Sequence, residues 1–129
     1  KELLRINAKY YCVDATLRNL LVGNASCDTG HILENIVFLE LICRGYTVYV
    51  GQLAKGEIDF VAEKAGITEY YQVSETVLDP NTLNRELAPL EAINDQYPKF
   101  LLTLDELNKN ANYDGIQQRN VLEWLLESC

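Results

Sequence analysis

Three polar side chains on two neighbouring apolar segments have the types and spacing to take part in metal chemistry. Asp59 lies near the start of the first segment, and Gln72 and Ser74 end the second. The turn residues Ala65-Gly66 between them predict that the two segments pair as a hairpin. Mg²⁺ binds oxygen ligands such as carboxylates and amides, and could then act on a phosphodiester. Gln72, however, would supply an oxygen without a charge.

A further carboxylate that could join this site lies in the segment 29–44. This segment is apolar on nearly every side, which predicts a helix packed on more than one face and ended by Gly45. It nevertheless carries Glu34 and Glu40. A carboxylate in an apolar helix needs a partner, a metal ion or a path to solvent. We expect Glu34 either in the pocket of Asp59 or at the surface, and Glu40 in a structural hydrogen bond within the helix–sheet interface.

The remaining pattern predicts the elements that would hold these side chains. Strands are expected at 9–13, 46–50, 58–63, 67–73, 98–104 and 116–121, and further helices at 15–22, 82–94 and 122–126. Asp79 precedes Pro80 and is expected to cap the helix that follows. Residues 108–115 are polar and predict a loop. This order predicts an α/β fold with a mixed sheet flanked by helices.

Composition and charge narrow the classes of function. With 129 residues, 48% of them hydrophobic, the chain can form one domain with its own core. Its net charge of −8 argues against a domain that grips nucleic acid mainly by neutralising phosphates. The four cysteines match no zinc pattern, and we expect Cys12 and Cys43 to be buried, reduced thiols of an intracellular protein. The lone His31 is expected to be a capping or surface residue.

Five segments of the chain, taken in order, resemble one group of proteins. The segment 28–41 is similar to the pattern G-x-x-x-E-N-x-V-x-x-E-L of that group, and the segments 10–19, 44–49, 57–61 and 71–74 resemble its other motifs. Thr16 stands where the group has Gly. The group is the C-terminal nuclease-like domain of prokaryotic AAA-type ATPases, archaeal-type ATPases among them. It belongs to the PD-(D/E)XK nuclease superfamily, and the resemblance runs from about Lys9 to Leu126.

The resemblance implies a restriction-endonuclease-like fold and a defined set of site residues. Glu34 would come from the helix and Asp59 from the first hairpin strand, with Mg²⁺ between them. Positions 72 and 74 would hold Glu and Lys, but this chain has Gln72 and Ser74. The site is therefore predicted to be degenerate, with weak Mg²⁺ binding and no efficient nuclease activity. Lys55 or Arg85 could replace the missing lysine, and the sequence does not choose between them.

The resemblance also implies that residues 1–129 are one nuclease-like domain at the C-terminal end of a longer, cytoplasmic ATPase. The chain has no G-x-x-x-x-G-K-[ST] motif, so ATP would bind only to an upstream domain. The expected partners are that ATPase domain and a protein or a nucleic acid, but not a membrane. Three hypotheses stay open: an interaction or regulatory module, an active Mg²⁺-dependent nuclease with a rearranged site, and an unrelated α/β binding domain.

Overall fold

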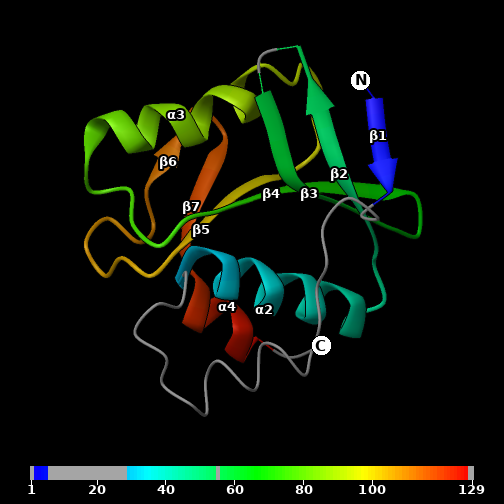
Figure 1. Cartoon of the computed structure of the whole chain (residues 1–129), viewed down its shortest axis with the longest axis horizontal. Helices are drawn as coiled ribbons and strands as arrows, with labels where there is room; N and C mark the ends of the chain where they lie inside the picture. Colours follow the sequence, from blue (N-terminus) through cyan, green and yellow to red (C-terminus); the bar gives the residue numbers. More distant parts are fainter. Residues whose placement is uncertain (1, 6–28, 55, 128–129) are drawn as a thin grey trace.

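The computed structural model describes residues 2–5, 29–54 and 56–127. In this part of the chain, seven strands form one sheet in the order β1-β2-β3-β4-β5-β7-β6. Helix α3 covers one face of the sheet, and helices α2 and α4 cover the other (Figure 1). The strands are β1 (Glu2–Arg5), β2 (Thr47–Leu53), β3 (Gly56–Lys64), β4 (Ile67–Val73), β5 (Lys99–Thr103), β6 (Asn112–Tyr113) and β7 (Ile116–Asn120), and the helices are α2 (Thr29–Cys43), α3 (Pro80–Glu91) and α4 (Val121–Leu126).

The sheet is mixed, as the sequence predicts. Strands β1 to β4 are antiparallel, β4, β5 and β7 are parallel, and β6 returns antiparallel to β7. The predicted hairpin of β3 and β4 is confirmed, with Lys64 opposite Ile67. Ala65 and Gly66 between them have φ values of 52° and 80°. Two consecutive positive φ values are typical of a type I′ turn, whose twist matches that of the strands.

Helix α2 ends where the sequence predicts. Gly45 has φ 91°, a backbone conformation that favours glycine. The N–H of Tyr46 donates to the carbonyl of Leu41, and the N–H of Gly45 donates to that of Ile42, both at 3.0 Å. These two bonds satisfy carbonyls at the helix end and turn the chain directly into β2. The predicted cap of helix α3 is confirmed, because Asp79 Oδ1 accepts from the N–H of Asn81 at 2.9 Å. The helix itself begins at Pro80, two residues earlier than predicted.

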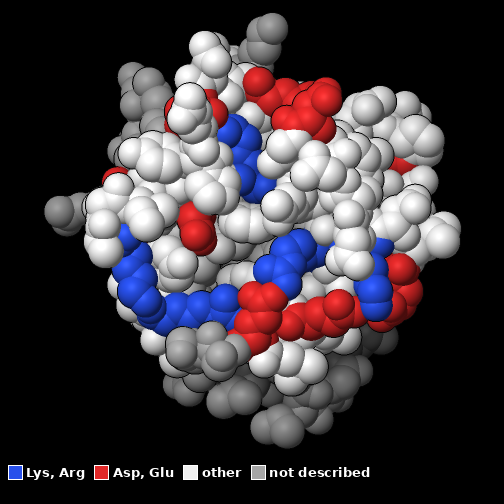
Figure 2. All heavy atoms as spheres, turned by 180° about the vertical axis from the view of Figure 1, so that it is seen from behind, with Lys and Arg blue, Asp and Glu red and all other residues white. Residues whose placement is uncertain are grey.

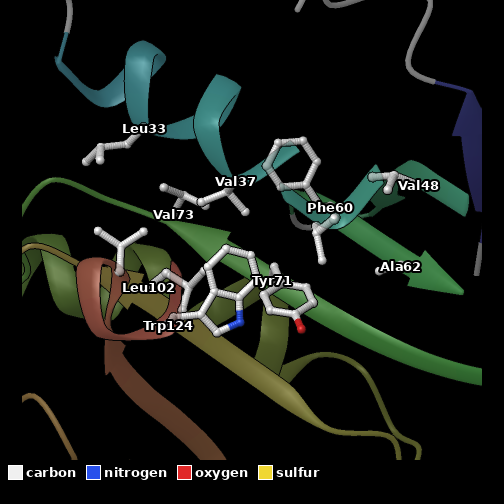
Figure 3. Packing of buried hydrophobic residues seen from close by; sticks show 11 residues of the cluster. Leu33, Val37, Val48, Phe60, Ala62, Tyr71, Val73, Leu102 and Trp124 are labelled. Carbon is white, nitrogen blue, oxygen red and sulfur yellow. The ribbon is translucent and has the colours of Figure 1, made fainter. Parts of the chain in front are cut away.

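A hydrophobic core lies between the sheet and the two helices α2 and α4. Leu33 and Val37 reach down from α2 toward Val73 of β4, while Trp124 comes from α4 (Figure 3). The ring centroids of Trp124 and Tyr71 lie 5.7 Å apart. Such tilted aromatic pairs add stability beyond the area they bury. Trp124 is a packing residue, since only 2% of it is exposed.

A second core lies between the sheet and α3. It contains Leu87, Leu90 and Ile93 from this helix and its C-terminal turn, packed on strand residues of the other sheet face. Both faces of the sheet are thus covered, which explains why Phe60, Val61 and Ala62 follow one another in β3 and all three are buried. Among the described residues, no helix has the length and apolar character needed to cross a membrane.

Some expectations are wrong or lie outside the described residues. Cys43 is exposed rather than buried, because it is the last residue of α2 and lies beyond the buried stripe. Strands β1 and β6 were not predicted, since both are short edge strands without an alternating pattern. The predicted strand 9–13, the predicted helix 15–22 and Cys12 fall outside the described residues.

Candidate functional site

Asp59 lies at an irregularity in β3. Gly51 of β2 pairs with Ile58 and Tyr49 pairs with Val61, so β3 holds one more residue than β2 between these pairs. This is a β-bulge, which bends a strand and redirects its side chains. Gly51 permits it, because a Cβ atom there would lie 2.9 Å from Ile58 Cβ and from Val61 Cγ2. Asp59 also comes directly before Phe60, the first residue of β3 that pairs with β4.

Asp59 and Gln72 continue the contact between β3 and β4 where the regular pairing stops. The backbone N–H of Asp59 donates to Gln72 Oε1 at 2.7 Å. In return, the N–H of Val73 donates to Asp59 Oδ2 at 2.9 Å. Each side chain therefore accepts a backbone N–H of the opposite strand. The sequence predicts that these two residues lie together, and the structure brings them together in this way.

The other end of the Gln72 amide faces helix α3. Gln72 Nε2 donates to the carbonyl oxygen of Glu86 at 3.3 Å and, more weakly, to Glu86 Oε2 at 3.5 Å. Only 3% of Gln72 is exposed. A glutamine can make both kinds of contact because it carries an acceptor oxygen and a donor nitrogen. A glutamate at this position could accept from Asp59 but could donate nothing to Glu86.

Glu34 approaches the same edge of the sheet from helix α2. Its side chain is 20% exposed, and one carboxylate oxygen lies 3.8 Å from His31 Nδ1. Burial raises the pKa of Glu86, the charge of Arg85 lowers it, and the charge of Glu34 raises it further. The carboxylates of Glu34 and Glu86 therefore come from opposite faces of the sheet and influence each other. As predicted, His31 is a surface residue, with 52% of its side chain exposed.

Ser74 is engaged elsewhere. Its hydroxyl donates to the carbonyl of Thr76 at 3.0 Å, and its backbone N–H donates to the carbonyl of Leu102 at 3.0 Å. Asp105 then fixes the following turn, because its carboxylate accepts from the hydroxyl of Thr76 at 2.7 Å and from the N–H of Val77 at 2.8 Å. Ser74 thus belongs to the turn that leads from β4 to α3.

The remaining candidates have separate positions. Glu40 forms an ion pair with Arg44, with 2.6 Å between Glu40 Oε2 and Arg44 Nε. Its role is structural, as predicted, but its partner follows the end of α2 and does not come from the helix–sheet interface. Arg44 also lies over the ring of Trp124 at 4.3 Å and donates to its carbonyl at 2.7 Å, so the pair holds α4 against α2. Arg85 is exposed beside Glu86. Lys55 lies outside the described residues.

This donor set does not fit a magnesium centre in the observed arrangement. Asp59 Oδ2 and Gln72 Oε1 both face backbone N–H groups, and the Gln72 amide nitrogen points toward Glu86. Within the described residues, no group of three or more His, Cys, Asp or Glu side chains is arranged to hold a metal ion. The hydrogen bonds of Asp59 and Gln72 instead connect β3 to β4 where the regular pairing stops. The Gln72 amide also attaches this end of the hairpin to α3.

Glu86 is the site residue that sequence reasoning missed. A signal was present, because Glu86 falls between Leu90 and Ile93 on the apolar stripe of its helix when the residues are placed at helical spacing. A carboxylate in such a stripe requires a polar partner. The resemblance implies site residues on the hairpin and α2 alone, whereas the partner of Gln72 comes from the helix that follows.

Comparison with known proteins adds one relative. A protein of Haemophilus influenzae, named only as uncharacterized, is 42% identical over 127 residues. The match covers 98% of this chain but 31% of the relative, so the chain spans about a third of the relative's length. No family model and no solved structure matches the chain.

Proposed function

We propose that this chain is a nuclease-like domain of restriction-endonuclease type, and that it acts as an interaction or regulatory module of an AAA-type ATPase. The metal pocket of such a domain has become a structural contact between β3 and β4, formed here by Asp59 and Gln72. We call this contact the joint. The order α2-β2-β3-β4-α3-β5 supports the fold assignment. The superfamily that the chain resembles has a core of a helix, three strands, a further helix and a strand in this order. The length of the Haemophilus relative is compatible with a larger parent protein. The presence of an ATPase domain in the parent protein is part of the same proposal.

The reciprocal hydrogen bonding of Asp59 and Gln72 is the observation that carries the proposal. In a nuclease, these oxygens would hold a divalent ion beside the scissile phosphate. Here both accept backbone N–H groups of the opposite strand. The hydroxyl at position 74 likewise stabilises a turn and brings no positive charge. With these hydrogen bonds, the site stabilises the sheet and no longer serves the cleavage of a phosphodiester.

The distribution of charge favours a protein partner over a nucleic acid. Four of the six Lys and Arg side chains that the structure describes form ion pairs with described acidic residues: Arg44, Lys99, Lys109 and Arg119. Figure 2 shows positive and negative side chains side by side across one face of the molecule. Cations that are already neutralised release few counterions from a nucleic acid, and that release drives phosphate binding.

An active nuclease is the second candidate, and one observation favours it. Glu34, Asp59 and Glu86 bring three carboxylates to one edge of the sheet, and Glu86 is near enough to Glu34 for the two charges to interact. If the Gln72 amide moved away, these oxygens could approach a cation. This candidate requires that the Gln72 amide give up its hydrogen bonds to Asp59 and Glu86.

The test is cleavage of DNA and RNA in the presence of Mg²⁺ or Mn²⁺. We expect no turnover above background with the unmodified chain, because the site lacks the charge of a second strand carboxylate and an ammonium group. Asp59→Ala is the control, since it removes the carboxylate that the predicted metal site takes from the hairpin. Metal-dependent cleavage that Asp59→Ala abolishes would overturn the proposal in favour of the active nuclease.

A further inference from the structure

A cleft of about 620 Å³ opens at the end of the sheet opposite to Asp59 and Gln72. It lies where β5 and β7 begin, at the paired residues Lys99 and Ile116. Leu90 and Ile93 of the α3 region line its apolar part, and its size falls in the range of ligand-binding sites. The segment 95–98 and the turn between β6 and β7 line its rim.

The first wall of the cleft is fixed before any ligand binds. Asp95 accepts from the hydroxyl of the buried Tyr70 at 2.6 Å and from the N–H of Tyr97 at 3.0 Å. Lys99 Nζ lies 3.2 Å from Asp95 Oδ1 and donates to the carbonyl of Tyr97 at 3.1 Å. These bonds hold the loop while Tyr97 remains 41% exposed. A wall that is already ordered loses little conformational entropy when a ligand binds.

The second wall is fixed in the same manner. The N–H of Gly115 donates to Asn112 Oδ1 at 2.8 Å, and the hydroxyl of Tyr113 donates to Gln118 Oε1 at 2.7 Å. Asp114 and Gly115 both have positive φ values, 52° and 98°, which makes the turn tight. The cleft therefore has an aromatic ring in each wall, Tyr97 in one and Tyr113 in the other.

The charge of the cleft is negative. Lys99 offsets Asp95 through their ion pair. Glu91 and Asp114 are both exposed and line the cleft, and neither carboxylate has a hydrogen bond or ion pair with a residue that the structure describes. The cleft thus offers two carboxylates beside two tyrosine rings and an apolar floor. This combination binds a cation that carries hydrocarbon, because the ring faces and the carboxylates both attract positive charge.

We propose that this cleft binds an arginine-containing peptide segment of a partner protein. The planar guanidinium can stack on a tyrosine and pair with a carboxylate, while its methylene groups cover Leu90 and Ile93. Tyrosines in ordered walls are typical anchors of protein interfaces. The proposal rests on the proposed interaction role and adds to it the place and the chemistry of the partner.

The experiment is an amide chemical-shift titration of the ¹⁵N-labelled chain. The probe is an acetylated and amidated pentapeptide in which arginines alternate with alanines, and the matched peptide has glutamine for arginine. We expect the arginine peptide alone to shift amides of 95–97 and 113–117. The variant Glu91→Gln/Asp114→Asn should weaken its binding about fivefold to tenfold, because two partly exposed charge pairs are lost. Asn tolerates the positive φ at position 114.

A matched variant distinguishes binding in the cleft from general electrostatic attraction between the peptide and the negatively charged chain. Glu57→Gln/Glu75→Gln removes the same charge from exposed positions outside the cleft and should change the affinity less than about twofold, since distant charges are screened. Equal weakening by both double variants would overturn the proposal. So would shifts of the cleft amides by Ca²⁺ but not by the arginine peptide. Nuclease activity would overturn the proposed function without changing this titration, because the two sites lie at opposite ends of the sheet.

Discussion

The two ends of the parallel strands use polar side chains in opposite ways. At the carboxyl end, the side chains of Asp59 and Gln72 accept backbone N–H groups, and the buried Asp105 fixes the turn after β4. At the amino end, Glu91 and Asp114 line an open cleft, and the structure gives them no partner among the described residues. Ligands of open α/β sheets usually bind beyond the carboxyl ends of the strands. In this molecule that end is closed by its own hydrogen bonds.

The contrast separates polar groups that stabilise the fold from those available to a partner. A buried polar side chain that satisfies a backbone donor is costly to remove, because the donor is then left unpaired. An exposed carboxylate contributes little to stability and can change freely. Substitutions at the two ends should therefore have different effects on unfolding and on binding.

The largest effect is expected for Gln72→Glu. The new carboxylate would face Glu86 with no proton to donate, and only 3% of residue 72 is exposed. We expect a loss of about 2–4 kcal/mol in the free energy of unfolding at pH 7, measured by urea denaturation, because an unpaired charge is buried. The loss should be smaller at pH 5, where carboxyl groups take up protons more readily.

Gln117→Glu is the matched control, since it makes the same change at an exposed residue of the cleft and should cost less than about 0.5 kcal/mol. If Gln72→Glu is as stable as the unmodified chain without metal, the amide is not needed at the joint. If Mg²⁺ stabilises Gln72→Glu and leaves the unmodified chain unchanged, the joint has kept the shape of a metal pocket. That outcome would show that the closed end of the sheet derives from a former ligand site.

An intermediate effect is expected for Asp59. Asp59→Ala leaves the N–H of the buried Val73 without its acceptor and should cost about 1–2 kcal/mol in urea denaturation. Asp59→Asn keeps an oxygen in place and should cost about half as much. The matched change at the cleft, Asp114→Asn, should stay within about 0.5 kcal/mol. Equal losses for Asp59→Ala and Asp59→Asn would mean that the charge, and not the hydrogen bond, matters at the joint.

The sequence predicted the parts of the fold that rest on strong local signals. Helix α2, its end at Gly45, and the β3–β4 hairpin all follow from apolar spacing and turn residues, and the structure has them. The bulge in β3 could not be predicted, because it depends on the close approach of Gly51 to Ile58 across two strands. Edge strands such as β6 also gave no signal, since two residues cannot show an alternation.

Only the part of the candidate site that lies on the β3–β4 hairpin could be predicted from the sequence. The proximity of Asp59 and Gln72 follows from strand pairing, which fixes residues opposite each other. The partner Glu86 lies in another element, and its approach depends on how α3 packs over the sheet. The cleft at the amino end is formed by two loops that are distant in sequence, and neither loop has a pattern that shows they meet.

The smallest effect is expected for Glu86→Gln, and its sign distinguishes two roles for this residue. Burial, together with the charge of Glu34, raises the pKa of Glu86 above the usual glutamate value of 4.5. A raised carboxyl pKa means that the folded state binds the proton more tightly than the unfolded state does. This contribution to stability is therefore complete below pH 4.5 and is lost as the pH rises through the raised pKa.

Glu86→Gln cannot ionise and escapes this loss. The variant should gain roughly 0.5 kcal/mol over the unmodified chain at pH 7 and no advantage at pH 4, measured by urea denaturation across this range. Glu91→Gln is the matched control, because it makes the same change at an exposed position of the same helix. A variant less stable than the unmodified chain at pH 7 would show that the ionised Glu86 is a favourable partner of the Gln72 amide. The stability of the closed end would then depend on the charge of Glu86. The contributions of the two ends to stability would differ by more than the hydrogen bonds alone imply.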